Sequence, residues 1–258
     1  RGNPDISLGN IVGSNIFNVA LIIGIVSLIK PLRIYTQTMK KEIPFMILTG
    51  FILFVLISYK KIKPYSENTL NRVDGLIFLL FLFGFLYYVY GEAKINREVA
   101  MTENEGTPLY SKIKSSSYTL GGLISVIIGG DMVVRSSSEI AYSLGMSQAL
   151  VGLTIVAMGT SLPELVTSIV ATVKGNPEIA LANIIGSNIF NILFILGVTS
   201  SISPISVSHK VSADVAIMIL VMVLLWCFAR AKGKVTRRGG SVFIIFYTIY
   251  MIYIIIRN

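Results

Sequence analysis

The chain has 258 residues, of which 53% are apolar and 14% are charged, and its formal net charge is +9. A water-facing surface needs more charge than this, so the composition excludes an ordinary soluble protein. Because the basic residues flank apolar stretches, the positive charge favours a role in membrane topology over nucleic-acid binding. The single cysteine, Cys227, and the single histidine, His209, exclude an internal disulfide and a Cys/His metal cluster.

Mostly apolar stretches of roughly 17–25 residues, the length that a helix needs to cross a bilayer, follow one another along the chain. They predict an all-α, polytopic membrane protein with about eight spans, at residues 5–29, 42–58, 74–90, 119–136, 148–173, 178–202, 211–229 and 240–256. The spans 148–173 and 178–202 carry polar side chains and glycines that a simple anchor would not tolerate. Polar groups at membrane depth are costly and indicate a cavity or a helix contact.

The longest connection between spans, residues 91–118, mixes acidic and basic side chains and is typical of a solvated linker. It divides the chain into the segments 1–90 and 119–258. If the linker is cytoplasmic, most of the Lys and Arg residues lie on the same side of the membrane as the linker, which the positive-inside rule favours. The basic connection 59–73 lies on the opposite side.

An internal repeat is the strongest pattern in the sequence. Residues 1–32 and 174–205 align without a gap, and more than half of the aligned positions are identical. The segment Gly-Ser-Asn-Ile-Phe-Asn at 13–18 recurs at 186–191, and ordered polar positions of this kind do not match by chance. Five predicted spans precede the second copy, and an odd number of crossings reverses its direction. We therefore predict an inverted-topology repeat, with a substrate site near the membrane midplane.

The segment that precedes the second copy, residues 151–173, has no counterpart before the first copy, because the sequence begins at Arg1 inside the repeat. The sequence therefore looks truncated at its N-terminus. We expect about two further helices before Arg1, and these helices would carry part of the substrate site.

Polar chemistry is concentrated around the segment Gly-Thr-Ser-Leu-Pro-Glu at 159–164. Pro163 has no amide hydrogen, so the carbonyl of Gly159 loses its helical partner, and we predict a bent or locally opened helix. Thr160 and Glu164 are four residues apart and share a helix face. A carboxylate, a hydroxyl and free carbonyl groups are hard oxygen donors, which suit Ca²⁺ and Na⁺ better than soft metals.

A second set of oxygen donors comes from the repeat. Ser187 and Asn191 are four residues apart, and Ser14 and Asn18 are their equivalents in the first copy. An Asn side chain offers an uncharged carbonyl oxygen, and two antiparallel copies would place the oxygens of these two asparagines and two serines around one cavity. The serines serve either close helix packing or ion contact. Their neighbours Asn15 and Asn188 are expected to hydrogen-bond from helix to helix.

These residues resemble the alpha-repeats of the sodium/calcium exchangers of prokaryotic type, in the cation/calcium antiporter superfamily. The resemblance rests on GTSLPE at 159–164 and KGNPEIALANIIGSNIFN at 174–191, and it covers nearly the whole chain, least well 34–116. It implies ten helices in two inverted halves of five.

The same resemblance assigns the segments and the site. Residues 1–90 would be the remainder of the first half, 91–118 a cytoplasmic linker and 119–258 the second half. Asn in place of Asp at position 191 favours a potassium-independent exchanger. On the matching positions, the implied ion ligands are Glu164, Thr160, Ser161, Asn18, Asn191, Ser14, Ser187 and the carbonyl of Ala157.

The expected function is that of a secondary active antiporter, not an enzyme, which exchanges Na⁺ for Ca²⁺ across the cell membrane by alternating access. Its expected partners are the two ions and the lipid bilayer, without a cofactor, a nucleic acid or an inferable protein partner. A proton/calcium exchanger or another cation exchanger is an alternative, because glutamates also titrate. An intramembrane enzyme is a remote alternative, because the hydroxyls near Glu164 have no histidine or nucleophile turn beside them. A channel or a purely structural protein is a further one.

Overall fold

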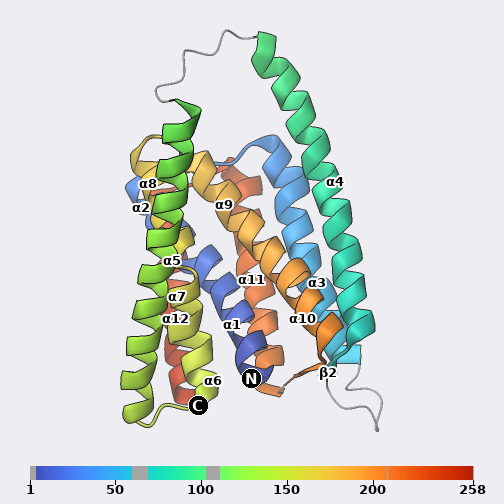
Figure 1. Ribbon diagram of the computed structural model, residues 1–258, viewed down its shortest axis with the longest axis vertical. Coiled ribbons are helices and arrows are strands. Elements are labelled where there is room, and N and C mark those ends of the chain that lie inside the picture. The colour runs from blue at the N-terminus through green and yellow to red at the C-terminus, as the bar shows by residue number, and fades with distance from the viewer. Residues whose placement is uncertain (1–3, 60–68, 103–110, 208, 258) are drawn as a thin grey trace.

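The computed structural model describes residues 4–59, 69–102, 111–207 and 209–257, and almost all of them lie in helices that run side by side (Figure 1). Short π-helical turns, labelled η, interrupt several spans. The elements in chain order are α1 (Pro4–Ile16), η1 (Phe17–Ile22), α2 (Ile23–Ile29), β1 (Leu32–Arg33), η2 (Thr38–Glu42), α3 (Ile43–Tyr59), β2 (Thr69–Leu70), α4 (Arg72–Thr102), α5 (Lys112–Ser143), α6 (Gln148–Val151), η4 (Gly152–Val156), α7 (Ala157–Thr160), α8 (Leu162–Val173), α9 (Pro177–Phe190), η5 (Asn191–Leu196), α10 (Gly197–Ile202), β3 (Ile205–Ser206), α11 (His209–Lys232), β4 (Lys234–Val235) and α12 (Arg237–Arg257).

The described helices confirm the all-α fold and the predicted spans. Those that are long and apolar enough to cross a membrane are Leu8–Ile29, Thr38–Ser58, Arg72–Lys94, Ile113–Ser143, Pro177–Ile202, Val211–Lys232 and Arg237–Arg257. A bent pair of helices, Thr154–Thr160 and Leu162–Val173, would form a further span. The predicted number of about eight therefore agrees with the structure.

The connection predicted as a solvated linker, residues 91–118, is helical over much of its described length. Helix α4 continues to Thr102 and α5 begins at Lys112. Residues 91–98 are rich in Glu, Ala, Lys and Arg, which have high helix propensity, so a helix that leaves the apolar region has no local reason to stop. Residues 103–110 lie outside the described part.

The two copies of the repeat run in opposite directions. In Figure 1 the first copy rises from the N-terminus through α1 to α2, whereas the second descends from α9 to α10. Each copy ends in a short strand that forms an antiparallel ladder: β1 pairs with β4 and β3 pairs with β2. The ends of the two copies are therefore held at opposite ends of the molecule.

The two copies also meet through reciprocal hydrogen bonds. Nδ2 of Asn15 donates to the carbonyl oxygen of Asn188 at 3.3 Å, and Nδ2 of Asn188 donates to the carbonyl oxygen of Asn15 at 3.3 Å. Because these two residues are equivalent in the repeat, the exchange is what a two-fold relation produces, as in a symmetric dimer. Both side chains are fully buried, and the expected helix-to-helix bonding of these asparagines is confirmed.

Glycines let two pairs of helices pack with their backbones close together. A Cβ at Gly75 of α4 would lie 2.7 Å from the carbonyl oxygen of Gly197 in α10, and a Cβ at Gly240 of α12 would lie 2.7 Å from that of Gly24 in α2. Gly24 and Gly197 are equivalent in the repeat. Small residues at such contacts are typical of helix packing in membranes, and each copy thus uses the same device against a different helix.

This packing gives a prediction with an internal control in the same helix. Gly75→Ala is expected to destabilise the protein by about 1–3 kcal/mol, because the added methyl group meets backbone that cannot move aside. Gly84→Ala, where nothing lies within 4 Å of the added Cβ, is expected to stabilise α4 slightly through helix propensity. Thermal unfolding of the purified variants in detergent measures both. Equal shifts of the two melting temperatures would contradict the packing.

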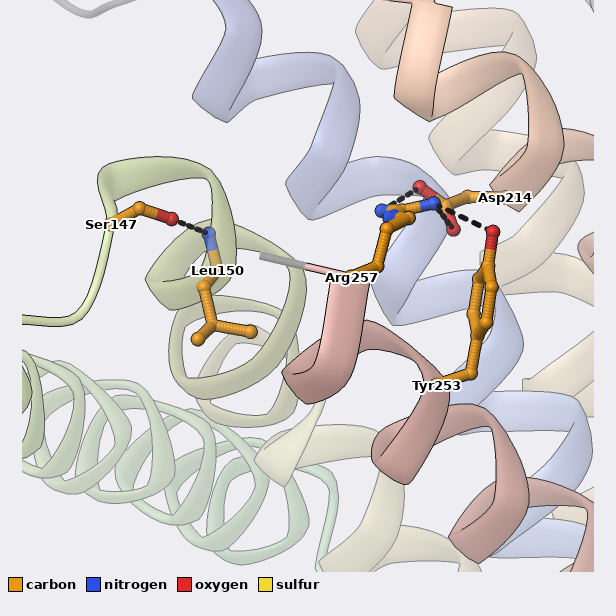
Figure 2. A network of polar contacts seen from close by, with 5 residues as sticks. All are labelled: Ser147, Leu150, Asp214, Tyr253 and Arg257. Atoms are coloured by element: carbon orange, nitrogen blue, oxygen red, sulfur yellow. Dashed lines mark hydrogen bonds and ion pairs between the residues drawn. The ribbon is translucent and has the colours of Figure 1, made fainter.

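A buried ion pair joins the beginning of α11 to the end of α12 (Figure 2). Nη1 and Nη2 of Arg257 donate to the two carboxylate oxygens of Asp214 at 3.0 and 2.9 Å, and the side chain of Asp214 is 0% exposed. The guanidinium also lies over the ring of Tyr253, 5.1 Å from its centroid. Nearby, the Ser147 hydroxyl accepts the amide hydrogen of Leu150 and caps α6. The ion pair links the beginning of α11 to the end of α12.

Candidate ion-binding site

The helix that carries Glu164 is broken, as the sequence predicts. Segments Thr154–Thr160 and Leu162–Val173 meet at an angle of 48°. Ser161 leaves the helical conformation, with φ −97° and ψ 5°. Pro163 lies in the first turn of α8, where its missing amide hydrogen costs nothing. Glu164 is thereby placed at the beginning of a new helix, next to the break.

A cavity of about 370 Å³ opens beside this break. Its wall is formed by α1, the broken helix, η5, α10 and β3, so both copies of the repeat contribute to it. Among the described residues that line it, Glu164 supplies the one carboxylate. The full lining is Asn10, Ile11, Ser14, Thr160, Ser161, Glu164, Asn191, Ile195, Leu196, Thr199 and Ile205.

Helix α1 packs its hydroxyl-bearing face against the end of α7. The Ser14 hydroxyl lies 3.1 Å from the carbonyl oxygen of Ala157 and 3.0 Å from the Thr160 hydroxyl. Thr160 Oγ1 lies 3.2 Å from the same carbonyl oxygen and 3.2 Å from Oδ1 of Asn10. Four oxygens from two spans are thus gathered at one wall of the cavity.

Two further asparagines are held by their amide nitrogens. Nδ2 of Asn18 donates to Oδ1 of Asn188 at 3.0 Å, and Nδ2 of Asn191 donates to Oδ1 of Asn15 at 3.0 Å. Asn18 also donates to the Ser187 hydroxyl at 3.3 Å. Because the nitrogen of each amide is engaged across the repeat, its oxygen is the atom left to face a ligand.

Within the described part of the chain, no donor reaches Oδ1 of Asn18 or Oε2 of Glu164, although both atoms are buried. A buried acceptor without a partner costs free energy, and more so when it is charged. A bound cation can satisfy a buried oxygen of this kind. These two buried oxygens belong to residues that the sequence predicts as ion ligands.

The structure brings most of the predicted ligands together. Those that line the cavity are Ser14, Thr160, Ser161, Glu164 and Asn191. Ala157, Asn18 and Ser187 do not line it: the Ala157 carbonyl is bonded to the cavity wall, and Asn18 and Ser187 are bonded to each other. Their place beside the cavity is compatible with the predicted role but does not test it.

Sequence reasoning missed two polar residues of the lining, Asn10 and Thr199. A signal existed for each. Asn10 stands four residues before Ser14 and therefore on the same helix face. Thr199 stands eight residues after Asn191, two turns further along the second copy, which also puts it on the same face.

Three of the described π-helical turns, η1, η4 and η5, adjoin a predicted ligand. Asn18 lies in η1, Asn191 begins η5, and Ala157 directly follows η4. A π turn inserts an extra residue into the helix and shifts the direction of the side chains beyond it, and such turns are frequent at functional sites. The donors gathered here are carboxylate, amide, hydroxyl and carbonyl oxygens, the type that Ca²⁺ prefers.

The fold is that of a polytopic membrane protein, and its cavity is lined by oxygen donors that include one carboxylate among the described residues. These features are typical of the class of cation transporters. The family model of the sodium/calcium exchanger protein matches residues 1–91 and 114–256. The chain therefore belongs to this family of cation/calcium exchangers and is a multi-pass membrane protein, so the resemblance predicted from the sequence is confirmed.

Individual proteins and a solved structure show how far the similarity extends. The chain is 34% identical to the putative antiporter CaxA of Alkalimonas amylolytica, over 92% of this chain and 73% of that protein. It is 32% identical to the inner membrane protein YrbG of Escherichia coli, over 88% of this chain and 70% of that protein. A structure of the sodium-calcium exchanger NCX_Mj, soaked with Na⁺ and Sr²⁺, superposes with a TM-score of 0.71 at 27% identity, covering 96% of this chain and 76% of that one.

Proposed function

We propose that the protein is a secondary active antiporter, not an enzyme, which exchanges Na⁺ for Ca²⁺ across the cell membrane. The observation that carries this proposal is the pair of buried, unpaired oxygens on Glu164 and Asn18, in a region otherwise built from hydroxyl, amide and carbonyl oxygens. Family membership supports a cation/calcium exchanger, and the name of the inner membrane relative supports the cell membrane.

The proposed ligands are the eight positions that the resemblance implies. Ca²⁺ in proteins takes about 6–8 oxygen ligands, and Na⁺ competes for overlapping oxygens of the same wall. The lining supplies one negative charge, from Glu164. The proposed ligands are Glu164, Thr160, Ser161, Asn18, Asn191, Ser14, Ser187 and the carbonyl of Ala157.

Alternating access is the proposed mechanism. Support comes from the opposite directions of the two copies in Figure 1, from their reciprocal Asn15–Asn188 bonds, and from a cavity that both copies line. In an inverted repeat of this kind the halves exchange conformations around a fixed midplane site. We propose that 1–90 belongs to one half and 119–258 to the other, with 91–118 as the cytoplasmic linker between them.

Transport in reconstituted vesicles tests the function directly. The full-length protein in proteoliposomes loaded with Na⁺ is expected to take up radiolabelled calcium when diluted into Na⁺-free buffer, and external K⁺ is expected to have no effect. Vesicles with equal Na⁺ on both sides are the control. Uptake of the same rate with and without the Na⁺ gradient would refute Na⁺ coupling.

A proton/calcium exchanger is the second candidate, because the carboxylate of Glu164, which lines the cavity, is also a group that can carry a proton. The same vesicles with a pH gradient and no Na⁺ distinguish the two. Calcium uptake driven by the pH gradient alone would favour the second candidate, and uptake that requires Na⁺ favours the first.

A further inference from the structure

We infer that Asn10 is a positioning residue for ion binding, which orients the hydroxyl groups of Ser14 and Thr160 so that their lone pairs face the cavity. This inference rests on the proposed function. Oδ1 of Asn10 lies 3.2 Å from Thr160 Oγ1 and 3.4 Å from Ser14 Oγ. All three side chains line the cavity, yet Asn10 is not among the ligands implied by the family resemblance.

The argument begins with the protons of the two hydroxyls. Each hydroxyl has one hydrogen to donate and two lone pairs, whereas a carbonyl oxygen can only accept. The Ser14 and Thr160 hydroxyls have two carbonyl oxygens within reach, Oδ1 of Asn10 and the backbone oxygen of Ala157. When both hydrogens point to Oδ1 of Asn10, which has two lone pairs, both hydroxyl oxygens present only lone pairs to the cavity, and the Ala157 carbonyl stays free to contact a cation.

Removal of the Asn10 oxygen changes this balance. The two hydrogens are then shared between the Ala157 carbonyl, the other hydroxyl and the cavity itself. A hydrogen on the Ala157 carbonyl occupies a lone pair of a proposed ligand, and a hydrogen that points into the cavity repels a cation. In each case fewer oxygen lone pairs remain for the ion, so the affinity falls without any change in the fold.

The position of Asn10 explains why it can act in this way. It lies one turn before Ser14 on α1, and α1 brings it to the last residue of α7, 150 positions away in the sequence. Its equivalent in the second copy, Asn183, is used differently, since Nδ2 of Asn183 donates to the hydroxyls of Thr167 and Ser168 at 3.4 Å each. Asn183 acts through its donor nitrogen, whereas Asn10 acts through its acceptor oxygen Oδ1.

The test separates the acceptor oxygen from the volume of the side chain. Asn10→Leu keeps the approximate size and removes the oxygen, and Asn10→Asp keeps an oxygen acceptor at the same place. The readout is Na⁺-driven uptake of radiolabelled calcium by the full-length protein in proteoliposomes. Asn10→Leu is expected to raise the calcium KM about ten-fold, the equivalent of about 1.4 kcal/mol, with the maximal rate within about two-fold.

Asn10→Asp keeps the acceptor oxygen and adds a negative charge to the cavity lining, so its calcium KM is expected to be equal to or lower than that of the wild type. Thr248→Val, which removes an exposed hydroxyl from α12, is expected to leave the calcium KM unchanged. If Asn10→Leu is not monodisperse, Asn10→Ala takes its place, since it also lacks the acceptor and adds no atoms. An unchanged KM in the variant that lacks the oxygen, or an equal rise in KM for Asn10→Asp, would overturn the inference. Absence of Na⁺-driven uptake by the wild type would instead refute the proposed function.

Discussion

Glu164→Gln is expected to reduce Na⁺-driven calcium uptake by on the order of a hundred-fold or more, because the number of charged ligands sets calcium affinity over several orders of magnitude. Glu164 supplies the one carboxylate of the described cavity lining, and no donor among the described residues reaches its buried Oε2. The amide of a glutamine replaces one oxygen by a nitrogen whose hydrogens repel a cation. Initial rates of radiolabelled calcium uptake in proteoliposomes give the measurement.

The matched control is Glu178→Gln, the same exchange in the first turn of α9 and outside the cavity lining. There the carboxylate interacts with the helix dipole, which is worth about 0.3–1 kcal/mol of stability, so uptake is expected to stay near the wild-type rate. Unchanged uptake by Glu164→Gln, with a normally folded protein, would refute the role of this carboxylate.

Asp214→Ala is expected to produce the largest loss of stability, about 3–5 kcal/mol, because it leaves the guanidinium of Arg257 without its buried partner. The pair is bidentate, and the side chain of Arg257 is only 15% exposed. Thermal unfolding in detergent measures the loss. The double variant Asp214→Leu/Arg257→Met, which removes both charges, is expected to recover most of it.

An exposed ion pair is the control for this experiment. Nζ of Lys41 lies 2.9 Å from Oε1 of Glu92, and the two side chains are 57% and 22% exposed. Surface pairs of this kind contribute little, so Glu92→Gln is expected to leave the melting temperature nearly unchanged. A double variant at Asp214 and Arg257 that is less stable than Asp214→Ala would contradict the assignment of the loss to an unpaired charge.

Hydropathy and the repeat predict the spans and the break well, because both depend on local properties of the chain. Pro163 cannot bond to the residue four positions before it wherever it lies, so the bend at Ser161 follows from the sequence alone. The grouping of Ser14, Thr160 and Glu164 at one cavity is predicted from the family resemblance, because Thr160 and Glu164 lie outside both copies of the repeat.

Long-range packing decides what the sequence could not predict. Whether Asn10 accepts from Thr160 depends on how α1 rotates against α7, and Asp214 meets Arg257 only because the end of α12 comes close to the beginning of α11. The amphipathic pattern that fixes such rotations in soluble proteins is weak here, since both lipid and core are apolar. The π turns, which shift Asn18 and Asn191, likewise carry no composition signal that distinguishes them from α-helix.

The most direct test of the central claim is a structure of the full-length protein with Ca²⁺ bound, in which anomalous scattering locates the ion. The account predicts a peak about 2.3–2.6 Å from a carboxylate oxygen of Glu164, with hydroxyl or amide oxygens of the cavity wall completing the shell. A calcium peak elsewhere in the membrane-spanning region, with none at Glu164, would contradict it.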